Sequence, residues 1–125
     1  MSEARPYTKE LQLARGERRY VRKVASAKEW QRIADAKRSL CRICKHGMPT
    51  MDLHHLVARV HGGDDTDNNV VMLCRGCHIK VTQRSPLHCR VLLAVLSDDE
   101  WGYLIRKGGP DYPLRAYGVA VSRDG

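Results

Sequence analysis

Four cysteines in two closely spaced pairs constrain the fold of this chain more than any other feature. Cys41 and Cys44 form one pair and Cys74 and Cys77 the other, each with two residues between its cysteines. A turn of this length directs two thiolates at one ion, and two such turns complete the tetrahedral sulfur site typical of structural Zn²⁺. Residues 45–73 exceed the spacing of a simple zinc ribbon, so they have to form a structure of their own.

Length and hydropathy favour a metal-stabilised protein in a reducing compartment. A chain of 125 residues buries only a modest core, which a structural metal would reinforce. No apolar run approaches the length of a membrane span, and residues 1–10 lack the apolar stretch of a secretory signal. We therefore expect a cytoplasmic protein without a membrane partner. In such a compartment, cysteines serve as metal ligands or free thiols more often than as disulfides.

The positive charge of the chain is concentrated near its N-terminus. The net charge is +8, and residues 1–50 hold 13 Lys and Arg against 5 Asp and Glu, while the remaining residues are balanced. A basic end on a nearly neutral body indicates a polyanionic partner whose affinity depends on salt. A solvated helix face or a free tail has the same composition, so charge alone leaves these alternatives open.

Periodicity and capping signals divide the chain into three parts. We predict a basic arm or helix over 1–25, a metal-binding core over 26–84, and a helical extension with a tail over 85–125. Within the core, Ser26 and Glu29 form a capping-box pattern that begins a helix reaching residue 40. Further elements are predicted as strands over 51–60 and 70–73, helices over 74–84, 86–96 and 98–107, and an extended or loop tail over 110–125.

Three histidines and an asparagine lie between or beside the cysteine pairs. His54 and His55 are adjacent in a predicted strand, where neighbouring side chains point to opposite faces. Asn69 precedes the second strand, and His78 directly follows Cys77. Because four thiolates already complete a zinc site, these imidazoles are free for other chemistry.

This set of residues resembles the HNH endonuclease family, whose fold is a β-hairpin and a helix around a metal. The resemblance runs through "CRIC", "LHHLVAR", "GGDD", "NVVMLC" and "CRGCH", roughly residues 41–80. It implies an α+β protein with a small zinc-stabilised ββα-metal core and flanking α-helices. Ala58 stands where many relatives have proline, and Val70 where they have leucine; neither departure removes a functional group.

The resemblance also implies a role for each polar residue. His54 and His78 would be ligands of a catalytic divalent metal, and His55 would be the general base. Asn69 would orient that base or hold the adjoining loop. Imidazole ligands favour Mn²⁺, Ni²⁺, Co²⁺ or Zn²⁺ over Mg²⁺, although availability can still make Mg²⁺ the working ion.

Phosphodiester hydrolysis explains why two neighbouring histidines would diverge. The attacking water needs a proton acceptor on one side of the phosphorus, and the departing oxygen needs a cation on the other. A regular strand would spread the two rings widely, so we expect a bulge or a strand end at the pair. The basic residues nearby, which are Arg59, Arg75, Lys80 and Arg84, would contact phosphate or lie on the solvated surface, and the sequence leaves both alternatives open.

These features together predict a metal-dependent HNH endonuclease that nicks or cuts DNA. Small enzymes of this family resemble those of phages and prophages, some of which assist terminase during genome packaging, so terminase subunits are an implied partner. A restriction-type nuclease is the nearest enzymatic rival. A zinc-stabilised nucleic-acid-binding module without catalysis is an alternative from another class, and RNA is an alternative substrate. The sequence gives no signal for the oligomeric state.

Overall fold

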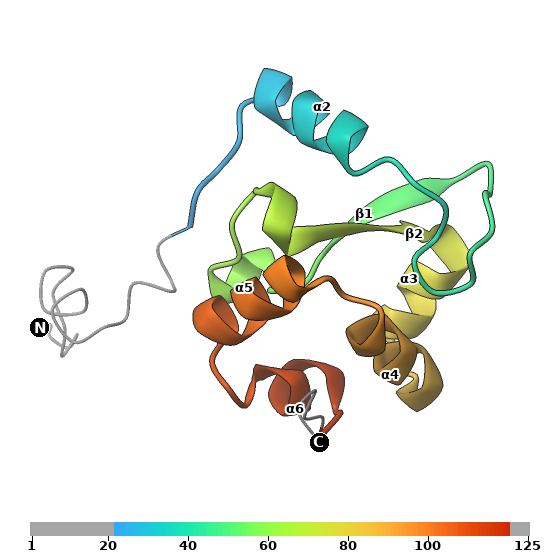
Figure 1. Cartoon of the computed structure of the whole chain (residues 1–125), viewed down its shortest axis with the longest axis vertical. Helices are drawn as coiled ribbons and strands as arrows, with labels where there is room; N and C mark the ends of the chain where they lie inside the picture. The colour runs from blue at the N-terminus through green and yellow to red at the C-terminus, as the bar shows by residue number, and fades with distance from the viewer. Residues whose placement is uncertain (1–21, 121–125) are drawn as a thin grey trace, which may run out of the picture.

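A two-stranded antiparallel hairpin lies at the centre of the fold, with helices on both sides of it (Figure 1). The computed structural model describes residues 22–120. Its elements are α2 (Ala27–Ala36), β1 (Met51–His55), β2 (Val70–Cys74), α3 (Arg75–Thr82), α4 (Pro86–Ala94), α5 (Asp98–Gly108) and α6 (Tyr112–Tyr117), with short 3₁₀ turns at Arg59–His61 and Asp67–Asn69. The α+β class predicted from the sequence is confirmed. The predicted arm over 1–25 falls mostly on residues 1–21, outside the described residues.

The hairpin is shorter than the sequence predicts. In its register His54 pairs with Val71 and His55 with Val70, and β1 ends at His55 instead of continuing to residue 60. The chain turns there, and the N–H of Val57 donates to the side chain of Asn69 at 2.8 Å in place of a partner on β2. The strand end expected at the histidine pair is therefore present, and the predicted extent of the strand is wrong.

Local capping signals begin two helices close to the predicted residues. The Ser26 side chain accepts a hydrogen bond from the backbone of Glu29 and begins α2. Ser97 and Glu100 form the reciprocal capping box that begins α5. Gly109, with φ of 103°, provides the backbone conformation that ends α5. The predicted helix over 26–40 is shorter than expected, because α2 ends at Ala36.

Helix α6 corrects the prediction of an extended or loop tail. It has six residues, and no side chain caps its first turn. Its stability comes from tertiary packing, because Tyr112 and Tyr117 are buried in the hydrophobic core. In Figure 1, α6 and α4 lie on the side of the hairpin opposite α2. No helix within residues 22–120 is both long and apolar enough to cross a membrane.

A buried carboxylate connects α5 to the chain that follows α2. Glu100 is 3% exposed and accepts hydrogen bonds from Lys37 Nζ at 2.6 Å and Arg42 Nη2 at 2.7 Å. Burial raises the pKa of this carboxyl, but the two cations and the Ser97 N–H outweigh burial and hold the pKa at about 2. Since Arg42 lies between Cys41 and Cys44, this ion cluster anchors the first cysteine pair to the helical extension.

We predict that Glu100→Gln lowers the free energy of unfolding at pH 7 by about 3 kcal/mol, because it leaves Lys37 and Arg42 without their shared counter-ion. The control is Glu29→Gln, which removes an exposed, solvent-screened partner of Arg32 and should change the free energy of unfolding far less than Glu100→Gln. A carboxylate with a lowered pKa stabilises the fold above its ordinary pKa of 4.5, and this contribution is lost as the pH falls to about 2. Urea denaturation should therefore show that the difference in free energy of unfolding between Glu100→Gln and wild type decreases over that pH interval. A difference that is independent of pH would contradict this account.

Candidate functional site

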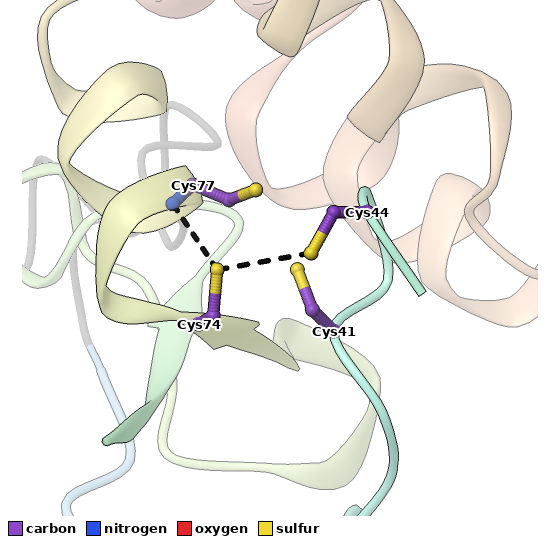
Figure 2. A group of neighbouring side chains, drawn as sticks. All are labelled: Cys41, Cys44, Cys74 and Cys77. Atoms are coloured by element: carbon purple, nitrogen blue, oxygen red, sulfur yellow. Dashed lines mark hydrogen bonds between the residues drawn. The ribbon is translucent and has the colours of Figure 1, made fainter. Parts of the chain in front are cut away.

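The four cysteines form one compact sulfur cluster (Figure 2). Cys41 and Cys44 come from the loop after α2, Cys74 ends β2, and Cys77 lies in the first turn of α3. All four Sγ atoms lie within 4.8 Å of one another, and those of Cys44 and Cys74 are 3.9 Å apart. Tetrahedral zinc with Zn–S bonds of about 2.3 Å places its sulfurs about 3.8 Å apart. The cluster therefore has the donor set and spacing of a structural zinc site.

The electrostatics of the cluster suit a bound cation. Burial opposes ionisation of Cys41, but backbone N–H groups of Cys44 and Cys74 outweigh it and lower the pKa of this thiol to about 6. Burial and the neighbouring sulfurs raise the pKa of Cys77. Four thiolates this close repel one another unless a divalent ion neutralises them. Cys89 lies outside the cluster and is buried in the core.

The two adjacent histidines at the end of β1 contact different helices, although both line the same open cleft. His54 lies against His78 of α3, with ring centres 5.2 Å apart and ring planes at 71°. His55 instead stacks on Trp30 of α2, with ring centres 5.5 Å apart and planes within 5°. One short strand thus presents an imidazole to each of two different environments.

His54 and His78 lie close together, and each ring has one nitrogen that is not engaged within residues 22–120. Nδ1 of His78 lies 3.0 Å from a carboxylate oxygen of Asp52, which leaves Nε2 without a hydrogen-bond partner among residues 22–120. Nε2 of His54 lies 2.9 Å from the hydroxyl of Tyr117, and its Nδ1 likewise has no partner in the described chain. Burial, followed by the charges of His78 and His55, lowers the pKa of His54 to about 3. The ring is therefore neutral, which is the state that binds metals, and a carboxylate behind a ligating imidazole is a common supporting contact.

His55 is oriented by a buried carboxylate. Its Nε2 lies 2.9 Å from Oδ1 of Asp65, which is 4% exposed. Burial raises the pKa of Asp65, but hydrogen bonds from the Ala25 N–H and His55, together with the charge of Arg22, outweigh burial and hold it at about 2. Because an ionised carboxylate only accepts hydrogen bonds, the proton of neutral His55 is on Nε2, and Nδ1 is left as a proton acceptor. Burial lowers the pKa of His55 below its usual value, while Asp65 opposes that shift.

Asn69 holds the loop that follows the histidine pair. It is fully buried, and its side chain accepts from Val57 N at 2.8 Å and donates to the carbonyls of Val57 at 3.1 Å and Asp64 at 2.9 Å. Gly63 is required in this loop, because a Cβ there would lie 1.7 Å from the carbonyl oxygen of Val57. Of the two roles that the resemblance implies for Asn69, these contacts match holding the loop.

The four basic residues predicted to contact phosphate lie at different distances from the histidines. Arg59 is half exposed and lines an open cleft of about 350 Å³ together with Trp30 and the three histidines, with its guanidinium 5.4 Å from the centre of the Trp30 ring. Arg75 lines the neighbouring cleft and makes a two-pronged ion pair with Asp52. Lys80 lies farther along α3 and Arg84 just after it, and both are exposed.

Three residues that orient the histidines were missed by the sequence reasoning. Asp52 could have been found, because it lies two residues before His54 and therefore on the same face of the strand. Asp65 is in the "GGDD" stretch, but nothing local identifies which of its two carboxylates contacts His55. Tyr117 lies in the misassigned tail, and no sequence signal connects it to the site.

The comparison with protein families agrees with this geometry. Residues 39–84 match the family model described as HNH endonuclease. The matched segment includes both cysteine pairs, the adjacent histidines, Asn69 and His78. No curated protein and no solved structure gives a significant match to the chain.

We predict that Cys41→Ser or Cys77→Ser abolishes zinc binding and unfolds the core. Zinc binding in such sites contributes on the order of 10 kcal/mol, which is comparable to the whole stability of a domain. The measurements are zinc per chain by mass spectrometry of metals and the thermal unfolding temperature. Cys89→Ala is the matched control, because it removes a buried thiol outside the cluster and should keep one zinc per chain. A zinc-free Cys41→Ser variant with the wild-type unfolding temperature would contradict the assignment.

Proposed function

We propose that this protein, whose residues 39–84 match the HNH endonuclease family model, is a metal-dependent nuclease that hydrolyses phosphodiester bonds of DNA. One observation carries the proposal: a short strand directs His54 toward His78 and directs the adjacent His55 toward Asp65. Phosphodiester hydrolysis needs a cation and a base on opposite sides of one phosphorus. This strand end supplies the groups for both.

In this proposal His54 and His78 hold the catalytic cation, and Asp52 supports His78 through its Nδ1. The ion, when bound, neutralises charge that develops on the phosphate and on the departing oxygen. Two protein ligands leave the remaining coordination positions for phosphate oxygens and water. The imidazole donors favour Mn²⁺, Ni²⁺, Co²⁺ or Zn²⁺ on ligand softness, with Mg²⁺ as the abundant alternative.

His55 acts as the general base. Its Nδ1 accepts the proton of the attacking water, and the carboxylate of Asp65 stabilises the imidazolium that results. The Trp30 ring stacked on His55 restricts rotation of the imidazole, so the accepting nitrogen keeps its direction. Asn69 acts at a distance, because it holds the loop between His55 and Asp64 in place.

Basic residues around the site provide the proposed contacts to DNA. Arg59 lines the same cleft as the histidines and is placed to bind the scissile phosphate or its neighbour. Arg75, Lys80 and Arg84 extend positive charge along α3, and the basic residues before position 50 add affinity that does not depend on sequence. Binding should therefore weaken steeply with salt.

The proposal also extends to the biological setting of the protein. The family resemblance supports a stand-alone enzyme of a phage or prophage, acting in the bacterial cytoplasm and assisting terminase. Co-purification of the tagged protein with terminase subunits from infected cells tests that role. Its absence would leave the nuclease chemistry standing and would remove the packaging role.

We predict that the purified, zinc-loaded protein nicks supercoiled plasmid when Mn²⁺ is added, and that His55→Ala and His78→Ala each reduce the rate by a factor of about 100 or more. The reason is that one variant removes the base and the other removes a metal ligand. His88→Ala is the matched control, because His88 pairs with Ser85 away from the clefts and should cut like wild type. Agarose gels and zinc content are the measurements.

Other outcomes of the same assay separate the alternatives. Plasmid that is retarded on the gel but intact with every divalent metal would contradict the nuclease and support a zinc-stabilised binding module. Loss of zinc and fold in His78→Ala would show that this residue is structural. Single-stranded RNA in parallel lanes, cleaved in preference to DNA, would replace the proposed substrate.

The pH dependence of cleavage gives a further prediction. Only neutral His55 accepts a proton, so the rate should rise with pH through the pKa of this group and level off below neutrality. Asp65→Asn removes the carboxylate that raises this pKa, so the rise should shift to lower pH while the plateau rate falls. Single-turnover rates between pH 4.5 and 8 measure both quantities.

Asp64→Asn is the matched control for this shift. Asp64 belongs to the same loop and binds Tyr103 and the backbone of Lys23, but it makes no contact with His55. Its profile should keep the wild-type midpoint. If the midpoint of the pH–rate profile of Asp65→Asn stays at the wild-type pH or moves to higher pH, the roles assigned to His55 and Asp65 are contradicted.

A further inference from the structure

We infer that α6, which lies outside the family segment 39–84, is part of the metal centre, because Tyr117 sets which nitrogen of His54 is available to a cation. Tyr117 is a positioning residue in this account and does not touch the substrate or the cation. The inference rests on the proposed function for the presence of a metal, and goes beyond it by assigning a role to the C-terminal extension.

The hydroxyl of Tyr117 is held between two polar groups in the protein interior. It lies 2.6 Å from the carbonyl oxygen of Leu56 and 2.9 Å from Nε2 of His54. Tyr117 is 5% exposed and Leu56 is 1% exposed. Water therefore has little access to this hydroxyl, and the protein itself has to satisfy it.

Hydrogen counting then fixes the tautomer of His54. A phenol has one hydrogen, and a carbonyl oxygen has none, so the hydrogen of Tyr117 goes to Leu56. Nε2 of His54 must accordingly carry a hydrogen and donate it to the phenol oxygen, since otherwise two lone pairs would face each other in a buried site. Neutral His54 is thus left with its lone pair on Nδ1.

His78 shows the opposite arrangement on the other side of the pair. Asp52 accepts from its Nδ1, which leaves the lone pair on Nε2. Each of the two rings therefore has one nitrogen engaged by a supporting residue and the other free. The support for His78 comes from within the family segment, whereas the support for His54 comes from α6.

Tyr112, a second tyrosine of α6, provides a control that distinguishes a positioning role from simple packing. The hydroxyl of Tyr112 accepts from the N–H of Ala58 at 3.0 Å and pairs with Nδ1 of His61 at 2.8 Å. It therefore holds the same loop after β1 and is as deeply buried, but it has no bond to His54. Tyr112→Phe removes a hydroxyl of equal kind from the same helix and leaves the contact between His54 and Tyr117.

The experiment compares wild type, Tyr117→Phe and Tyr112→Phe as full-length, zinc-loaded proteins. Long-range ¹H–¹⁵N spectra of the imidazoles, recorded before any second metal is added, report the tautomer of His54. We expect hydrogen on Nε2 in wild type and Tyr112→Phe, and a mixed or reversed tautomer in Tyr117→Phe. A merely structural tyrosine would not change this spectroscopic signature.

Calorimetric titration with Mn²⁺ gives the second measurement. Mn²⁺ is chosen because it prefers harder donors and competes poorly for the cysteine sulfurs. Loss of a residue that supports a metal ligand typically weakens affinity by 10-fold to 100-fold, so Tyr117→Phe should bind Mn²⁺ about 10-fold to 100-fold more weakly than wild type. Tyr112→Phe should remain within about threefold, because the ligand nitrogens are unchanged.

The outcomes distinguish this inference from the proposed function. Hydrogen on Nδ1 of His54 in wild type would overturn the inference, and so would wild-type Mn²⁺ affinity in Tyr117→Phe. If wild type shows the Nε2–H tautomer, Tyr117→Phe loses it, and neither protein binds Mn²⁺, then the positioning by Tyr117 is supported while the proposed metal centre fails.

Discussion

The convergence of four cysteine sulfurs to within 4.8 Å of one another is the constraint on which the rest of this structure depends. Cys74 ends β2 and also caps α3, so a metal on its sulfur would fix the angle at which the helix leaves the strand. That angle places His78 beside His54. The first cysteine pair is anchored in turn to α5, because Arg42 binds the buried carboxylate of Glu100. The sulfur cluster thereby positions His54 and His78, which are not among the cysteines that form it.

The alternating direction of side chains along β1 is the second feature that organises the site. Adjacent residues of β1 face different helices: His54 meets α3 and α6, and His55 meets α2. Each ring is then held by a group outside the strand, Tyr117 of α6 for the first and Asp65 of the following loop for the second. The matched segment 39–84 supplies the imidazoles and Asp65, and the flanking helices add Tyr117 and Trp30. A small hairpin thus gives two adjacent imidazoles different surroundings without needing a large core.

The parts of this architecture that follow from local chemistry were predictable from sequence. The cysteine spacing predicts the sulfur cluster, and the capping pattern at Ser26 predicts where α2 begins. Contacts that arise only after folding were not predictable. Helix α6 has six residues and no side-chain cap, so packing of Tyr112 and Tyr117 makes it helical. For the same reason β1 was predicted too long, because the side chain of Asn69 binds the N–H of Val57 in place of a partner strand.

The most direct test of the account is anomalous diffraction from crystals of the zinc-loaded protein soaked in Mn²⁺. The account predicts a zinc peak at the centre of the four sulfurs and a separate manganese peak within about 2.2 Å of Nδ1 of His54 and Nε2 of His78. The ring of His55 should point away from manganese and keep its bond to Asp65. Manganese bound elsewhere, or an ion shared by His54 and His55, would contradict the division of roles between the two adjacent histidines.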